Sequence, residues 1–346
     1  MPELLTVQQV DPWLQFNPYI VSGYRPRMTI RAALRSFFGW HNESFNIWTH
    51  AIAACFVFYL TLFPPAMDPT ATTTTTTTTT SVGSGGAGGV TAMAAAALPS
   101  YGRRWLGTSN EHLAGANPTT AFRATCLVFI AIFICSVVYH LFMPCPTSEV
   151  SYRRLMNCDV TGVVLCITAT SWSFLYRGNA CSAGWTSHAG FGAVLLSGLF
   201  VLYCVLFNAT CGAIGRLKAI GFHCALRLSV LLWIELPKVQ SQGYHQALHC
   251  HAMSYVFIAL GGVIGGFRFP ERQLRRVTQP QPASSAAEAT ATSRFWRWVG
   301  RFLVSSEEID YMWNSHTLWH YCIMLSTTMM LLGFYYDVEE YELARC

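Results

Sequence analysis

The feature that most constrains this chain is a series of long apolar segments that contain almost no charged residues. A helix that crosses a bilayer needs roughly 20 mainly apolar residues. Open strands cannot satisfy their backbone hydrogen bonds in lipid, and these segments lack the alternating polarity of barrel strands. We therefore expect an all-α membrane protein built as a seven-transmembrane helix bundle. The seven expected spans are residues 45–66, 124–144, 160–176, 189–210, 219–236, 252–267 and 316–336.

Composition supports a membrane protein. The 346 residues are 52% hydrophobic and 11% charged, whereas an average soluble domain is about 25% charged. The first 40 residues lack the apolar core of a signal peptide. The 13 cysteines lie mostly within the expected spans and form no CxxC pair, which indicates apolar packing rather than a disulfide framework.

The distribution of Lys and Arg predicts the orientation. Cytosolic loops of membrane proteins carry an excess of these residues. Most of the 22 Lys and Arg residues fall on one side if the N-terminus is cytosolic, so we expect a cytosolic N-terminus and an extracellular or luminal C-terminus. The net charge of +5 is then a topology signal. It supports no nucleic-acid partner, since no clustered basic face accompanies it. We expect residence in the plasma membrane or an endomembrane.

The chain divides into a cytosolic segment (1–44), the seven-helix domain (45–336) and a short external tail (337–346). A Thr/Gly/Ala-rich external loop at about 68–100 is expected to be disordered, and a low-complexity cytosolic insertion spans about 273–300. IRAALRSFFGW (30–40) and RFWRWVGRF (294–302) combine arginines with aromatic residues. Each is interpreted as an amphipathic helix at an anionic leaflet or as an ordinary juxtamembrane anchor.

This threading brings polar residues of three spans to one depth on the cytosolic side. Ser136 and His140 end the second span, Asp159 opens the third, and His316 and His320 open the seventh. Histidines four residues apart share a helix face and often hold a transition metal. With His140 they would form a zinc site of the open, catalytic type, with three protein ligands and one water. Asp159 would hold that water or act as a base, and Ser136 would bind the water or a developing oxyanion.

Other polar residues near or within the spans have competing interpretations. His223, His249 and His251 are read as interfacial or core histidines. Arg227 lies in the middle of the fifth span. Ionisable residues at such depth usually have a partner or a function. Arg227 is expected either to pair with a carboxylate elsewhere in the bundle or to bind the anionic head of a lipid or fatty acid.

Several motifs together resemble the progestin and adipoQ receptor family, which includes the adiponectin receptors and is related to the hemolysin III proteins. They are GYRP (23–26), SFFGWHNESFNIWTH (36–50), SVVYH (136–140) with Asp159 following, GGFRFPER (265–272) and HTLWH (316–320). The resemblance covers about 20–66, 121–176 and 252–336. It departs at the Thr/Gly/Ala-rich loop and at the insertion before HTLWH.

The resemblance implies a seven-helix bundle with an intracellular N-terminus. It also implies a zinc ion held by His140, His316 and His320, which Asp159 reaches through water. Alkaline ceramidases, which are distantly similar, use such a site to hydrolyse a lipid amide. The resemblance does not imply His50 as a ligand. We interpret Glu43, Asn46 and His50 as a hydrogen-bonding plug that ties the first span to neighbouring helix ends, with a direct catalytic role as the alternative.

Three functional hypotheses follow. The first is a receptor with zinc-dependent, ceramidase-like hydrolase activity, whose fatty-acid product would meet Arg227. The second is a signalling receptor with a purely structural zinc, and the third is a membrane scaffold. Membrane lipids such as ceramide or fatty acid are the expected partners. An extracellular ligand and the oligomeric state are left open by the sequence.

Overall fold

The computed structural model describes residues 2–65, 118–172, 184–207, 212–242, 246–278 and 306–340. Within these ranges the long elements are all helices, and the strand-like pairing is an isolated bridge between Leu5 and Tyr24. The seven long helices are α2 (Ser44–Leu62), α3 (Pro118–Phe142), α4 (Glu149–Ala169), α6 (Gly184–Phe207), α7 (Ala213–Gln242), α8 (Gln246–Phe267) and α12 (Ser315–Glu340). Each is long and apolar enough to cross a membrane, which confirms the predicted fold class.

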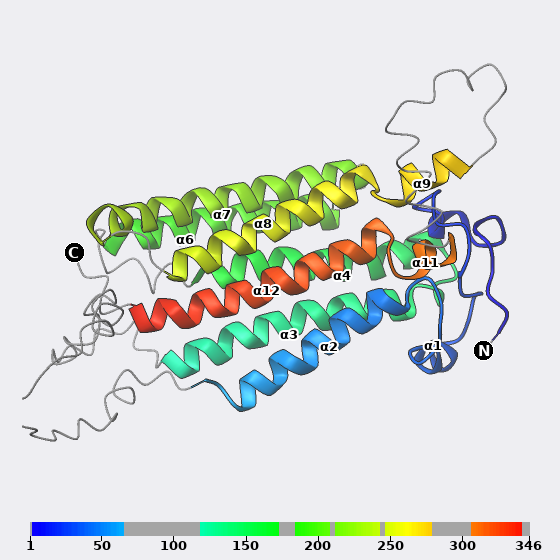
Figure 1. Cartoon of the computed structure of the whole chain (residues 1–346), viewed down its shortest axis with the longest axis horizontal. Coiled ribbons are helices and arrows are strands. Elements are labelled where there is room, and N and C mark those ends of the chain that lie inside the picture. The colour runs from blue at the N-terminus through cyan, green and yellow to red at the C-terminus, as the bar shows by residue number, and fades with distance from the viewer. Residues whose placement is uncertain are drawn as a thin grey trace, which may run out of the picture.

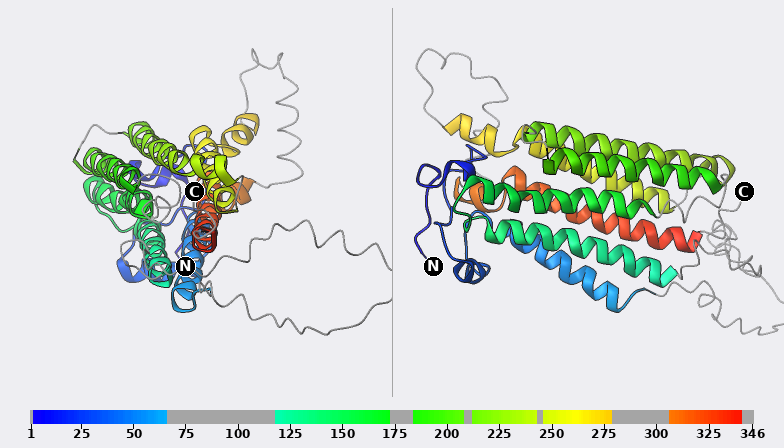
Figure 2. Two further views of the ribbon diagram at one scale, coloured as in Figure 1. Left: turned by 90° about the vertical axis from the view of Figure 1, so that its left-hand side faces the viewer. Right: turned by 180° about the vertical axis from the view of Figure 1, so that it is seen from behind.

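The helices lie side by side along the long axis of one bundle (Figure 1; end-on in Figure 2). α3 packs between α2 and α4, and α6 packs between α4 and α7. α12 contacts α8, α2 and α3. Helix α12 therefore lies beside α2 and α3, and this contact brings the HTLWH motif next to His140.

Several helices, α3, α4, α7 and α8 among them, begin or end outside the predicted spans, because their polar ends continue beyond their apolar centres. α4 begins at Glu149, where the Ser148 hydroxyl accepts a hydrogen bond from the Ser151 amide at 3.3 Å. Asp159 therefore lies inside α4 and does not open it, contrary to the sequence prediction. α8 similarly begins at Gln246, and α7 extends over 213–242.

The centre of the bundle is apolar, and its outer surface is apolar as well. Ala53 and Val57 of α2 pack with Phe129 and Phe133 of α3 and with Phe334 of α12. Large apolar side chains also point outward, as expected where lipid is the solvent. These exposed residues include Phe56, Phe58, Leu127, Leu196, Phe200, Trp233 and Val256.

Close helix contacts depend on small residues. A Cβ atom at Gly261 of α8 would lie 2.7 Å from the Trp319 ring and 2.9 Å from Cys322 Cβ of α12. Glycine at this position therefore lets α8 and α12 approach closely, as is common between membrane helices.

The N-terminal residues form an ordered cap over one end of the bundle (Figure 1). The cap contains 3-10 helices η1 (Val7–Gln9) and η2 (Pro12–Leu14) and the short helix α1 (Ile30–Ser36). Its residues Leu14, Ile20 and Tyr24 pack against Tyr139 of α3 and Tyr152 of α4. The cap thus covers the end of the bundle where α3 ends and α12 begins.

Helix α1 covers the first part of the predicted amphipathic segment, and Ile30, Leu34 and Phe38 are exposed there. The insertion before HTLWH begins with α9 (Glu271–Thr278), and α11 (Ser306–Tyr311) precedes α12. The predicted external loop 68–100, the rest of the insertion and the segment 294–302 lie outside the described residues.

Candidate metal centre

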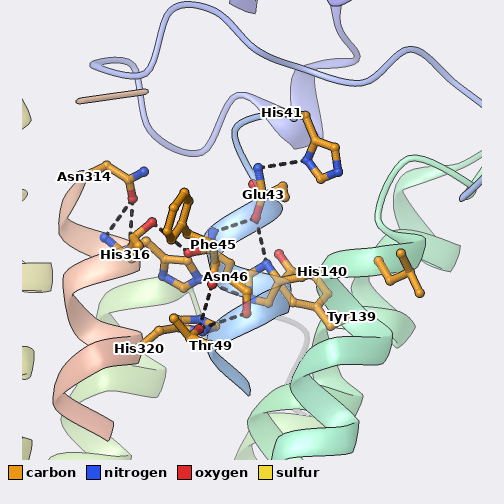
Figure 3. Close-up of polar contacts among 12 residues, drawn as sticks. His41, Glu43, Phe45, Asn46, Thr49, Tyr139, His140, Asn314, His316 and His320 are labelled. Atoms are coloured by element: carbon orange, nitrogen blue, oxygen red, sulfur yellow. Dashed lines mark hydrogen bonds and ion pairs between the residues drawn. The ribbon is translucent and has the colours of Figure 1, made fainter. Parts of the chain in front are cut away.

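Three histidines meet at the capped end of the bundle (Figure 3). His140 lies in the last turn of α3, and His316 and His320 lie in the first turns of α12. One ring nitrogen of each lies within 4.8 Å of the other two. The Nε2 atoms of His140 and His316 are 3.3 Å apart. The structure therefore brings together the three residues that the sequence singled out as metal ligands.

Hydrogen bonds on the outer side of the rings select which nitrogen faces the centre. His140 Nδ1 lies 2.8 Å from Glu43 Oε2, and a carboxylate can only accept this bond. The Thr49 hydroxyl donates to the Phe45 carbonyl at 2.7 Å, so it accepts from His320 Nδ1 at 3.4 Å. Both rings then present an unprotonated Nε2 inward, as histidines that bind a metal do. The residues fit a divalent ion that prefers imidazole.

Glu43 links the three helices that surround the centre. It precedes α2 as the N-cap residue, and its Oε2 also accepts from Asn46 Nδ2 at 2.7 Å. Asn46 Oδ1 in turn accepts from the Thr317 hydroxyl of α12 at 2.8 Å. Burial by itself would raise the pKa of Glu43, but the hydrogen bonds from His140 and Asn46 help to lower this pKa to about 2. The plug prediction is confirmed for Glu43 and Asn46.

The start of α12 is fixed by side chains on both sides of the His316 turn. Asn314 Oδ1 accepts from the amides of His316 and Thr317 at 3.1 and 3.0 Å, which is an N-cap. Glu271 at the start of α9 accepts from the Ser315 amide at 2.8 Å and from the Ser315 hydroxyl. These bonds hold His316 and His320 in register with His140.

Arg25 fixes the end of α3. Its buried guanidinium donates to the carbonyls of His140 and Leu141 at 2.5 and 3.0 Å, and to the Ser36 hydroxyl at 2.8 Å. These carbonyls have no partner within the helix, and a cation at a helix C-terminus is favourable. Burial lowers the pKa of Arg25 to about 10, so the side chain is still charged at neutral pH.

His41 completes the connection between the cap and Glu43. Its ring Nδ1 accepts from the Glu43 amide at 3.1 Å, and its Nε2 lies 3.2 Å from the Ser36 carbonyl. Burial, followed by the charge of Arg25, lowers the pKa of His41 to about 3. The ring is therefore neutral and orients the peptide group that carries Glu43.

Sequence reasoning missed Arg25, Glu271, Asn314 and Thr317. Arg25 lies in GYRP and Glu271 in FPER, motifs that carried only a resemblance. The Asn314–Ser315 pair before HTLWH is a readable helix-start signal. No local pattern shows that Arg25 meets α3 or that Glu271 meets α12.

Ser136 and Asp159 lie beside the centre without belonging to the ligand set. The Ser136 hydroxyl is buried one helical turn before His140 and has no well-formed hydrogen bond within the described residues. Asp159 of α4 lies close to both Ser136 and His140. Its carboxylate is not among the three groups that could hold a metal. The predicted roles of Asp159 and Ser136 toward a metal-bound water remain predictions.

Arg227 and the remaining histidines lie elsewhere. Arg227 of α7 donates to the hydroxyls of Ser171, Tyr255 and Thr170 at 3.0, 2.6 and 3.3 Å. Thr170 begins the 3-10 helix η5 (Thr170–Trp172) after α4, about three helical turns along from Asp159. The structure therefore does not bring Arg227 to the three histidines.

His223 and His251 are buried and hydrogen bonded, and His249 is exposed. His223 contacts the hydroxyls of Thr168 and Ser197, which confirms its reading as a core histidine. His50 stacks on His320 with ring centroids 3.9 Å apart, but neither of its nitrogens has a hydrogen-bond partner within the described residues. The plug prediction is therefore wrong for His50.

Comparison of the sequence with known proteins identifies the family of this chain. The sequence model of the haemolysin-III-related family matches residues 38–331. Human progestin and adipoQ receptor family member 4 is 28% identical over 271 residues, which cover 78% of this chain and 81% of the relative. Heptahelical transmembrane protein 1 of Arabidopsis thaliana is 40% identical over 60 residues, 17% of this chain and 18% of the relative.

ADIPOR-like receptor IZH3 of Saccharomyces cerevisiae is 44% identical over 55 residues, 15% of this chain and 10% of the relative. The seven apolar helices and these relatives identify a multi-pass integral membrane protein. The family match runs from the segment before α2 into α12 and so includes all three histidines. The chain therefore belongs to the haemolysin-III-related family, together with progestin and adipoQ receptors and ADIPOR-like proteins.

Proposed function

We propose that the protein is a zinc-containing seven-transmembrane receptor-type protein that hydrolyses the amide bond of a membrane lipid, with ceramide as the leading substrate. The observation that carries this proposal is the orientation of the three histidines. Their nitrogens converge, while Glu43 and Thr49 hold the opposite nitrogens of two of the rings. Three imidazoles without a fourth protein ligand in the group leave one position for water or substrate, as in catalytic zinc sites.

The surrounding residues supply the remaining roles. When bound, zinc provides Lewis acidity and lowers the pKa of a water molecule to about 7. Asp159 takes the proton from the attacking water and delivers it to the amide nitrogen. Ser136 donates a hydrogen bond to the carbonyl oxygen as negative charge develops there. A C–O bond forms and the C–N bond breaks, so the products are a fatty acid and a sphingoid base.

The proposed orientation places the cap in the cytosol. The Lys and Arg distribution supports it, as do the exposed apolar residues Ile30 and Leu34 beside the exposed Arg31 and Arg35 on α1. The metal centre would then lie near the cytosolic leaflet. Binding of an anionic lipid group by Arg227 remains a separate proposal, since its partner Thr170 lies about three helical turns along the chain from Asp159.

A structural metal is the second candidate function. The centre joins α3 and α12 directly and α2 through Glu43, so a metal there would also hold the helices of a signalling receptor together. The two functions differ in whether the bound metal supports hydrolysis.

The test combines metal analysis with lipid turnover. Zinc content and ceramide hydrolysis are measured on detergent-purified wild type, His320→Ala and, as a matched control, the exposed-residue variant His249→Ala. We expect about one zinc ion per chain and measurable turnover in wild type and control, and the loss of both in His320→Ala. Full turnover by His320→Ala would refute hydrolysis at this centre. Zinc without hydrolysis of any lipid in wild type would favour the structural role.

A further inference from the structure

His50 lies beside the metal centre with both ring nitrogens unsatisfied. The side chain is 4% exposed, and neither nitrogen has a hydrogen-bond partner in the described part of the chain. His50 follows Glu43 by seven residues and Asn46 by four, so it lies on the same face of α2, about one turn deeper in the bundle than Asn46. Its ring packs against the Phe133 ring of α3, with the ring centroids 5.1 Å apart, and stacks on the His320 ring.

The stacking does not replace the missing hydrogen bonds. The planes of the His50 and His320 rings are inclined by only 21°, and imidazole donates and accepts within its ring plane. An unpaired polar group is costly in a buried site. His223, in the same bundle, has a hydroxyl on each nitrogen. Within the described residues, the His50 ring thus lacks the polar partners that His223 has.

Ser136 is a second buried polar group, on the facing helix α3 and close to Asp159. Phe133, Ser136 and His140 recur at three- and four-residue spacing and so lie on one face of α3. Phe133 contacts His50, and His140 belongs to the metal centre. Ser136 therefore lies between the level of His50 and the level of the metal, and its hydroxyl is buried without a well-formed bond. His50 of α2 and Ser136 of α3 thus place two buried polar groups next to one centre.

The chemistry of imidazole indicates which ligand would satisfy His50. A neutral imidazole has one N–H donor and one acceptor nitrogen. A lipid ester contributes only acceptors at its reacting group, so the acceptor nitrogen of His50 would remain unpaired. A secondary amide contributes an N–H that this nitrogen can accept. The His50 N–H can then donate to an oxygen of the same lipid.

We infer that His50 is a substrate-binding residue that accepts the amide N–H of the lipid and makes the site prefer amides over esters. The inference rests on the proposed function for the reaction, but amide recognition can be measured by binding alone. A site that hydrogen-bonds a substrate group rejects an analogue that lacks the group, because the buried partner is left unpaired.

The experiment compares ceramide with an isosteric ester in which oxygen replaces the amide N–H. The variants are His50→Phe, which keeps an aromatic ring against His320, and His50→Gln, which keeps a donor and an acceptor. His50→Leu serves as a second apolar variant if His50→Phe fails to fold. Zinc content establishes that each centre is intact. Ligand-induced shifts of the melting temperature give the affinities, and hydrolysis of both lipids gives kcat/KM.

Wild type is expected to bind ceramide more tightly than the ester. His50→Phe should lose roughly tenfold in ceramide affinity, keep its affinity for the ester, and keep its zinc, while His50→Gln should recover part of the loss. The inference would be overturned if His50→Phe kept the wild-type preference for ceramide over the ester, or if it lost equal affinity for both lipids. It would also be overturned if neither lipid shifted the melting temperature of the wild-type protein. A preference that depends on His50 without any turnover would retain this inference and refute the hydrolase proposal.

Discussion

Two regions of this bundle bury histidines, but the ring nitrogens have different partners in each region. His223 of α7 has a partner on each nitrogen, with Thr168 Oγ1 at 3.0 Å and Ser197 Oγ at 3.1 Å. Thr168 gives its own proton to the Val164 carbonyl at 2.8 Å, so it accepts from the ring. At the metal centre, each of His140 and His320 has one nitrogen held by a partner and the other directed towards the common point.

The difference separates a packing histidine from a candidate metal ligand. Polar residues within a membrane bundle are expensive and must be satisfied or functional. His223 is satisfied and ties α7 to α4 and α6. His251 of α8 likewise contacts Asp337 of α12 at 2.9 Å, and Gly333 leaves room for its ring. Each of the three convergent histidines offers one nitrogen to a common point, where a single metal ion could bind all three.

The largest expected effect is the loss of the metal. His316→Ala/His320→Ala removes two of the three ligands, so zinc should fall to background, measured by elemental analysis of the purified protein. His249→Ala, which changes an exposed histidine of α8, should keep wild-type zinc. Equal zinc in the double variant and in wild type would show that the convergence is packing, like the surroundings of His223.

The next effect concerns the carboxylate behind His140. Glu43→Gln keeps the shape of the side chain but removes its charge, and loss of such a partner costs about 10- to 100-fold in metal affinity. The measurement is competition with a zinc chelator. The matched control is Glu149→Gln, since Glu149 is exposed and pairs with Arg153 at 2.6 Å. An affinity unchanged in Glu43→Gln would show that Glu43 does not orient the ligand.

Substitution of Arg25 tests whether the N-terminal cap stabilises the end of α3 beside the candidate metal centre. Arg25→Met removes charged hydrogen bonds to the last carbonyls of α3, so the free energy of unfolding should fall by about 1.5–3 kcal/mol. Thermal unfolding in detergent measures the change. Arg27→Met, which removes an exposed ion pair with Asp11 at 2.9 Å, should cost at most about 1 kcal/mol. Equal effects would mean that the buried Arg25 contacts contribute little.

The smallest expected effect is the difference in stability between substitutions of His223 and of His50. His223→Phe loses two hydrogen bonds and leaves the Ser197 hydroxyl unpaired, so it should destabilise the protein by about 1–2 kcal/mol without loss of zinc. His50→Phe loses no hydrogen bond within the described structure and should not destabilise it. Thermal unfolding of both variants, with zinc measured on the same samples, checks the difference. A larger loss in His50→Phe than in His223→Phe would contradict the assignment of His50 to ligand binding.

Much of the fold could be predicted because the bilayer leaves few choices. Each apolar segment must form a spanning helix, and alternate crossings place the ends of one span and the beginnings of the next on the same side. His140, His316 and His320 were therefore expected at one depth, and the structure places them together. The boundary of α4 was wrong because its first turns are polar and are held by Ser148 rather than by hydrophobicity.

The sequence by itself determined the seven long apolar helices and the residues that share one end of the bundle, since both follow from the length and order of the apolar segments. Only the tertiary structure decided which nitrogen of His140 or His320 faces the centre and that His50 lacks a partner. The physical reason is that a hydrogen bond has a specific geometry. The groups that make or omit these bonds come from α2, α3 and α12, far apart in the chain, and no local pattern encodes their meeting.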